Sequence, residues 1–181
     1  MKTFVGLLSV TLGVFLALLL QEVLPGVNVL HGARFVFVPM IFCYAAMALP
    51  FPAMLLAAVI TGFLTDLMYL HVVGGRVEIA LGCSIVYFVI YGSLANGFRP
   101  AFLRGHWWPV IPLSAIGTSG FLLMQFLMIT LRREGFVFDE AVIWRVLAPG
   151  LLAALFSPIL HSIVRPFALL IPENPLLAKS Y

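Results

Sequence analysis

Long apolar runs recur along this chain, and they limit the folds open to it more than any other feature. The first run, residues 3–20, contains no charged side chain. Later runs approach or exceed the ~20 residues that a helix needs to cross a hydrocarbon core about 30 Å thick. Charged residues make up only 9% of the chain, far below the roughly 25% typical of soluble domains. The sequence therefore predicts an all-α polytopic membrane protein.

The runs predict one bundle of about six transmembrane helices that forms a single domain over residues 1–181. The motif LPFP at residues 49–52 predicts a tight hairpin, because a proline moves the residue before it out of the α region. We expect a kink at Pro158 in the last helix. An even number of helices places both termini on one side of the membrane. The expected spans cover approximately residues 3–20, 35–49, 53–71, 77–95, 108–131 and 146–164.

The distribution of charge argues against nucleic acid as a partner and gives little information on orientation. The net charge is +3, but the basic residues occur singly in loops and at helix ends, without a basic stripe. The 10 Lys and Arg residues divide evenly between the two sides of the expected bundle, so positive-inside counting is tied. The acidic residues of the loops fall on the side opposite the termini. We expect both termini in the cytoplasm, with Trp107 and Trp108 at a membrane interface.

The sequence contains no motif for a cofactor or a metal. The two cysteines, Cys43 and Cys83, fall in expected spans, where they act as small apolar residues and imply no disulfide. There is no phosphate-binding glycine loop and no His/Cys/Asp cluster with metal-ligand spacing. We therefore expect no cofactor and no metal.

Asp66 is an acidic residue inside the apolar run of the third span. On a helix it lies in a stripe of small and polar side chains, opposite a face of large apolar ones. Small residues in such a stripe let a second helix approach closely, and hydroxyl and carboxylate groups hydrogen-bond across the contact. The stripe is therefore a predicted packing face. Its members are Ala58, Thr61, Gly62, Thr65, Asp66 and Tyr69.

Two roles remain open for Asp66. Its place toward the loop end of its span makes Arg34, Arg76 or a backbone group the natural partner for a structural role. The alternative is a direct part in binding a protein partner or a ligand, because ionisable residues inside membranes are expensive and often functional. The residues singled out for helix packing or partner binding are Gly62, Thr65, Asp66, Tyr69, Arg34 and Arg76.

The motif GTSG at residues 117–120 has the G-x-S-G form found in rhomboid intramembrane proteases, with His161 as a nominal base. Helix geometry argues against that pair. Ser119 lies about 16 Å from the side where its helix begins, whereas His161 lies only about 8 Å from that same side. A serine and its base must approach within about 3 Å. We therefore expect no enzyme, with Ser119 as a small residue at a helix contact.

Four segments of the chain are distinctive: LALLLQEVLP at the end of the first helix, ARFVFVPMIF opening the second, the LPFP hairpin, and above all GFLTDLMYL. In these segments the chain resembles the MreD family of bacterial rod-shape-determining membrane proteins. The family has a G-x-x-x-D-L pattern, which Gly62, Asp66 and Leu67 match. The sequence departs from the family after the aspartate, where HVVGG replaces a small-residue S-G-x-x-G turn.

The resemblance implies a non-enzymatic scaffold of the cell-elongation machinery in the bacterial cytoplasmic (inner) membrane. Its implied partners are an MreC-like bitopic protein, a complex of a RodA-type glycosyltransferase with a penicillin-binding protein and, indirectly, MreB filaments. The main alternative is the substrate-binding subunit of an energy-coupling-factor-type vitamin transporter, also a six-helix protein of about this size. That class needs a roomy polar pocket, and few polar side chains converge here to line one.

Overall fold

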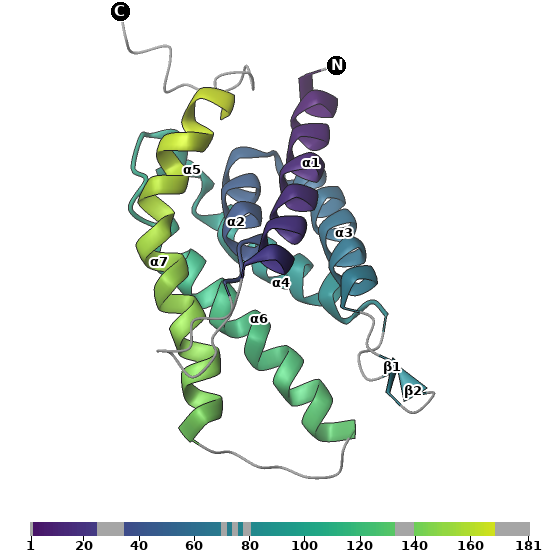
Figure 1. Ribbon diagram of the computed structural model, residues 1–181. Helices are drawn as coiled ribbons and strands as arrows, with labels where there is room; N and C mark the ends of the chain where they lie inside the picture. The colour runs from purple at the N-terminus through teal and green to yellow at the C-terminus, as the bar shows by residue number, and fades with distance from the viewer. Residues whose placement is uncertain are drawn as a thin grey trace, which may run out of the picture.

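The computed structural model describes residues 2–24, 35–69, 72–73, 76–77, 81–132 and 140–168. Within these ranges nearly all of the regular structure is helical (Figure 1). The helices are α1 (Lys2–Val23), α2 (Val38–Ala48), α3 (Phe51–Met68), α4 (Cys83–Gly97), α5 (Arg99–Leu103), α6 (Val110–Arg132) and α7 (Glu140–Ala168). Two short antiparallel strands, β1 (Val72–Val73) and β2 (Arg76–Val77), lie between α3 and α4.

Among the described residues, four helices, α1, α3, α6 and α7, are long and apolar enough to cross a membrane. Their outer faces carry large apolar side chains that no other part of the described chain covers. On α7, for example, Leu147, Leu151 and Leu155 follow one another at steps of four and are between 50% and 69% exposed. Such a stripe suits a lipid environment, because a helix repeats its faces about every 3.6 residues. The prediction of an all-α polytopic membrane protein is confirmed.

The second and fourth expected spans are shorter than predicted. Helix α2 has 11 residues and α4 has 15, so their axes are about 16 and 22 Å long. The expected start of the fourth span at residue 77 is wrong. Arg76 and Val77 instead pair with Val73 and Val72 in the β-hairpin, and the helix begins only after Gly82. That glycine has φ +101°, a left-handed conformation that ends regular helix and that side-chain-bearing residues rarely adopt.

The hairpin expected at LPFP is present, and prolines mark the starts of the helices around it. Leu49 and Pro50 are both extended, with ψ near 150° (149° and 152°), and α3 begins at Phe51. Pro52 stands in the first turn of α3 and Pro39 in the first turn of α2, where a missing N–H costs nothing. Helix α7 is continuous from Glu140 to Ala168, so it starts earlier than the expected residue 146.

Helix α2 occupies the centre of the bundle. It contacts α1, α3, α4, α5, α6 and α7, and Figure 1 shows it between α1 and α7. Phe42 of α2 forms an edge-to-face contact with Phe88 of α4 at 5.0 Å between ring centroids, and Phe88 in turn meets Phe121 of α6 at 5.5 Å. All three rings are buried. The core of the molecule therefore forms around α2, and the longer helices surround it.

Candidate functional site

The candidate site lies where the end of α3 meets the start of α4. Asp66 is in the last turn of α3 and only 4% exposed. Four other members of its stripe, Ala58, Thr61, Gly62 and Thr65, are buried as well. The opposite face of the helix is open, with Val59, Phe63, Leu67 and Met68 at least 40% exposed. The spacing of the sequence thus divides α3 into a packed polar face and a lipid-facing apolar face.

The Asp66 carboxylate binds the first turn of α4. Its Oδ2 accepts a hydrogen bond of 2.6 Å from the Gly82 backbone N–H, and its Oδ1 accepts one of 3.3 Å from the Ser84 N–H. Gly82 is the N-cap residue of α4 and has no side chain with which to cap it. The first N–H groups of a helix lack intrahelical acceptors, and the helix dipole places partial positive charge there. Asp66 therefore caps α4 from a neighbouring helix.

Gly62 brings the two helices close enough for this contact. A Cβ atom placed on Gly62 would overlap the backbone of Ile85, at 2.5 Å from the Ile85 nitrogen. Gly62 is one turn before Asp66, so the same face that lets the α4 backbone approach also carries the carboxylate. The Gly-x-x-x-Asp spacing therefore has one physical purpose in this structure, which is to hold the first turn of α4 against α3.

Thr65 and Tyr69 lie at the same end of α3 but make other contacts. The Thr65 hydroxyl donates to the Thr61 carbonyl of its own helix at 2.7 Å. The Tyr69 hydroxyl accepts a hydrogen bond of 2.8 Å from the Gln21 side-chain Nε2 of α1. The side-chain oxygen of Gln21, Oε1, accepts one of 3.4 Å from the Phe37 N–H. This chain of contacts joins the end of α3 to α1 and to the segment that enters α2.

The two expected cationic partners of Asp66 are not placed beside it by the described residues. Arg34 lies outside the described residues. Arg76 is described only through its backbone, which pairs with Val73 in the β-hairpin. Of the three kinds of partner considered for Asp66, the structure therefore shows the backbone group.

Several polar residues that sequence reasoning did not single out also cross between helices. The Asn96 side chain of α4 donates to two carbonyls at the end of α2, those of Ala46 at 2.6 Å and Leu49 at 3.0 Å. Tyr87 and Tyr91 of α4 donate to backbone carbonyls of α6. Gln21 and Asn96 are isolated amides within apolar runs, and this sequence feature could have identified the contacts that their side chains make.

Ser119 and His161 face different neighbours. A Cβ on Gly150 of α7 would overlap the Ser119 hydroxyl, so Ser119 packs where α6 and α7 touch. His161 stacks on Trp107 at 5.7 Å and on Tyr44 at 5.9 Å, measured between ring centroids. Gly150 and His161 are separated by about 16 Å along α7 at the helical rise. Ser119 and His161 therefore do not form a serine–histidine pair.

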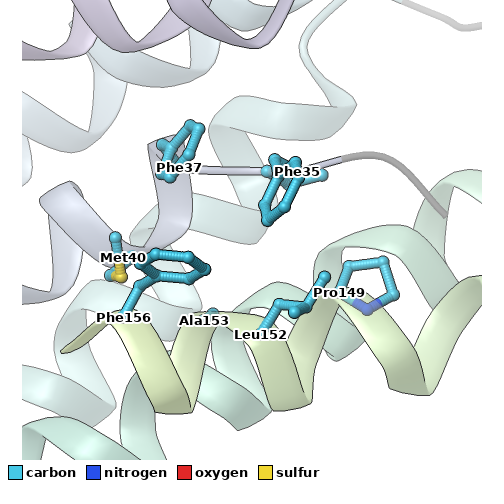
Figure 2. Close-up of a pocket in the computed structure, with 8 residues that line it drawn as sticks. Phe35, Phe37, Met40, Pro149, Leu152, Ala153 and Phe156 are labelled. Carbon is cyan, nitrogen blue, oxygen red and sulfur yellow. The ribbon is translucent and has the colours of Figure 1, made fainter. Parts of the chain in front are cut away.

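A small apolar pocket opens between the start of α2 and the middle of α7 (Figure 2). Its volume is about 10 Å³, and apolar side chains line it, so it has room for about one water molecule. Sites for drug-sized ligands usually measure roughly 300–1,000 Å³ and include a few convergent polar groups. In the described residues, no three His, Cys, Asp or Glu side chains gather to hold a metal. The lining residues are Phe35, Val36, Phe37, Met40, Pro149, Leu152, Ala153 and Phe156.

Comparison of the chain with protein-family models, with curated proteins and with solved structures gave no match. The MreD-like motifs are therefore a resemblance in short segments. The structure shows what two residues of the motif GFLTDLMYL contact. Gly62 lies against the Ile85 backbone, and Asp66 binds the first turn of α4.

Proposed function

We propose that this protein is a non-enzymatic scaffold of the bacterial cell-elongation machinery, similar to MreD. In this role it binds an MreC-like single-span protein and links MreB filaments to a RodA-type glycosyltransferase and its penicillin-binding partner. The bilayer in question is the bacterial cytoplasmic membrane, with both chain termini on the cytoplasmic side.

The observation that carries the proposal is the contact that the G-x-x-x-D-L motif makes between α3 and α4. Gly62 admits the α4 backbone and Asp66 caps α4 through Gly82 and Ser84. Both residues therefore hold two helices in a fixed relation, and a scaffold needs such a fixed surface for its partners. The lipid-facing residues of α3 and α4 beside this contact then present a surface of fixed shape to a partner helix.

The alternatives receive less support from the same geometry. A transporter subunit for a vitamin-sized molecule needs a larger and more polar pocket than the recess between α2 and α7. A rhomboid-like protease needs a serine within hydrogen-bond reach of a histidine, whereas Ser119 packs against Gly150 and His161 stacks on aromatic rings.

Affinity purification in mild detergent tests the proposal. The tagged protein, expressed in a rod-shaped bacterium in place of that cell's own MreD, should retain a single-span protein of the MreC type and should sustain rod shape. The Gly62→Ala variant should lose both properties. Gly97→Ala is the matched control, because a Cβ at Gly97 meets nothing within 4 Å. Retention of a vitamin-like small molecule with no protein partner would contradict the scaffold and favour the transporter.

Orientation is tested separately. A cysteine introduced at Lys179 should resist an impermeant thiol reagent in intact spheroplasts and react after lysis. Labelling in intact spheroplasts would place the C-terminus outside and contradict the proposed orientation.

A further inference from the structure

A basic and aromatic segment, residues 98–108, joins α4 to α6. Its sequence, FRPAFLRGHWW, holds two arginines, a histidine and two tryptophans but no carboxylate. The other long polar connection, residues 132–140, has the sequence RREGFVFDE, in which acidic residues outnumber arginines. The two connections carry opposite charge balance, and residues 98–108 form the one that would attract an anion.

The local fold gives this segment a fixed shape. Helix α5 ends in two hydrogen bonds around Gly105, which has φ +90°. The His106 N–H donates to the Ala101 carbonyl at 3.1 Å, and the Gly105 N–H donates to the Phe102 carbonyl at 3.0 Å. This is the pattern of a helix C-terminus closed by a left-handed glycine. Phe102 is buried and meets the Tyr44 ring edge-to-face at 6.2 Å, so α5 is held against the central helix.

Arg99 has a buried N–H group at Nε, and no acceptor in the described part of the chain binds it. A buried donor without an acceptor is costly, and a charged one more so. Arg104 and His106 follow on the same segment with exposed side chains. The segment thus combines one arginine that lacks a partner for a buried N–H with a second arginine that is open to the surroundings.

The depth of the segment indicates which anion is at hand. Trp107 is 43% exposed and Trp108 is 60% exposed, and tryptophans of membrane proteins concentrate at the level of the headgroups. At that level phospholipid phosphates are the nearest abundant anions.

We propose that residues 98–108 bind the headgroup of an anionic phospholipid. Arg99 and Arg104 contact the phosphate, and the rings of Trp107 and Trp108 border the glycerol and upper acyl region. The stack of Trp107 on His161 connects the site to α7. Such a site would hold one end of the bundle at a defined depth in the bilayer.

Tryptophan fluorescence can test this, because the chain has 3 tryptophans and the third, Trp144, lies at the start of α7. The Trp144→Phe variant reports only on the proposed site. A second variant with Trp107 and Trp108 both changed to Phe reports only on Trp144, which stands beside Arg145 and thus provides a matched control. Each is reconstituted in vesicles in which brominated-chain phosphatidylglycerol or brominated-chain phosphatidylcholine replaces increasing fractions of the unbrominated lipid.

Brominated phosphatidylglycerol should quench Trp107 and Trp108 with an apparent affinity several-fold above that of phosphatidylcholine, and Trp144 should show no such preference. Arg104→Gln and Arg99→Gln should each lower the preference by on the order of threefold to fivefold. Arg104 is exposed, so its substitution leaves the packing of α5 intact. Arg145→Gln should change nothing at the proposed site.

Four results would overturn the proposal. Equal quenching by the two lipids at Trp107 and Trp108 would show that the site does not select the headgroup. A preference that survives both arginine substitutions, or one equally strong at Trp144, would show that these arginines do not provide it. Loss of the preference in inorganic phosphate, but not in sodium chloride of the same ionic strength, would indicate a site for free phosphate instead of lipid.

Discussion

Removal of the Asp66 carboxylate should loosen the contact between α3 and α4 by a predictable amount. In Asp66→Leu, the N–H groups of Gly82 and Ser84 lose their acceptor. Each buried donor left unsatisfied costs about 1–3 kcal/mol. The Ser84 contact is long at 3.3 Å, so we place its share at the lower end of that range. The expected loss for Asp66→Leu is about 2–4 kcal/mol of unfolding free energy.

Asp66→Asn should be milder. The amide oxygen can still accept from the Gly82 N–H, but the amide NH₂ then faces the Ser84 N–H, and the charge that opposes the α4 dipole is gone. We expect a loss of about 1–2 kcal/mol. Glu22→Gln is the matched control, because it removes an exposed carboxylate at the same end of the bundle and should change stability by less than about 0.5 kcal/mol.

Reversible unfolding in mixed detergent and SDS micelles, followed by far-UV circular dichroism, measures these differences. The reasoning predicts the order wild type, Glu22→Gln, Asp66→Asn, Asp66→Leu, from most to least stable. If Asp66→Leu unfolds at the same SDS fraction as the wild-type protein, or if Glu22→Gln lowers the stability as much as Asp66→Asn, the carboxylate does not act as the cap of α4.

Gly62→Ala and Asn96→Leu test two other contacts by the same unfolding measurement, and Ser119→Ala is tested in cells. Gly62→Ala should cost about 1–3 kcal/mol, because the new Cβ overlaps the Ile85 backbone, whereas Gly97→Ala should lie within about 0.5 kcal/mol of wild type; equal effects would contradict the close approach of α3 and α4. Asn96→Leu removes the donor to two carbonyls at the end of α2 and should cost about 1–3 kcal/mol, and an unchanged midpoint would mean that those carbonyls find other donors. If the proposed function is right, Ser119→Ala should leave expression and rod shape unchanged, and loss of function at normal membrane levels would reopen the protease alternative.

The sequence was sufficient for the features that depend on hydropathy and helical spacing. The uncharged run before residue 21 and the run around Asp66 each became a long helix, and the stripe through Gly62 and Asp66 became a buried face. It failed at the start of α4, because the residues between 77 and 82 are largely apolar and hydropathy alone does not distinguish a turn from a helix. The left-handed conformation of Gly82 decides that boundary.

The central position of α2 and the partner of Asp66 could not be derived from residue types. An all-apolar helix reads alike whether lipid or other helices surround it, and nine of the 11 residues of α2 prove to be buried. Sequence reasoning left Arg34, Arg76 and a backbone group open as partners of the carboxylate, and the described contacts are with the backbone N–H groups of Gly82 and Ser84. Backbone donors carry no signature in a sequence, so only the packing of the two helices reveals them.

Hydrogen exchange at the first turn of α4 tests the central claim, that Asp66 caps this helix from α3, most directly. In the wild-type protein in micelles, the amides of Gly82 and Ser84 should exchange slowly, because each donates to the carboxylate. In Asp66→Leu both should exchange at least tenfold faster under conditions where the amides in the middle of α4 keep their protection, and Glu22→Gln should leave all of these rates unchanged. Equal protection of Gly82 and Ser84 in the wild-type and Asp66→Leu proteins would contradict the account.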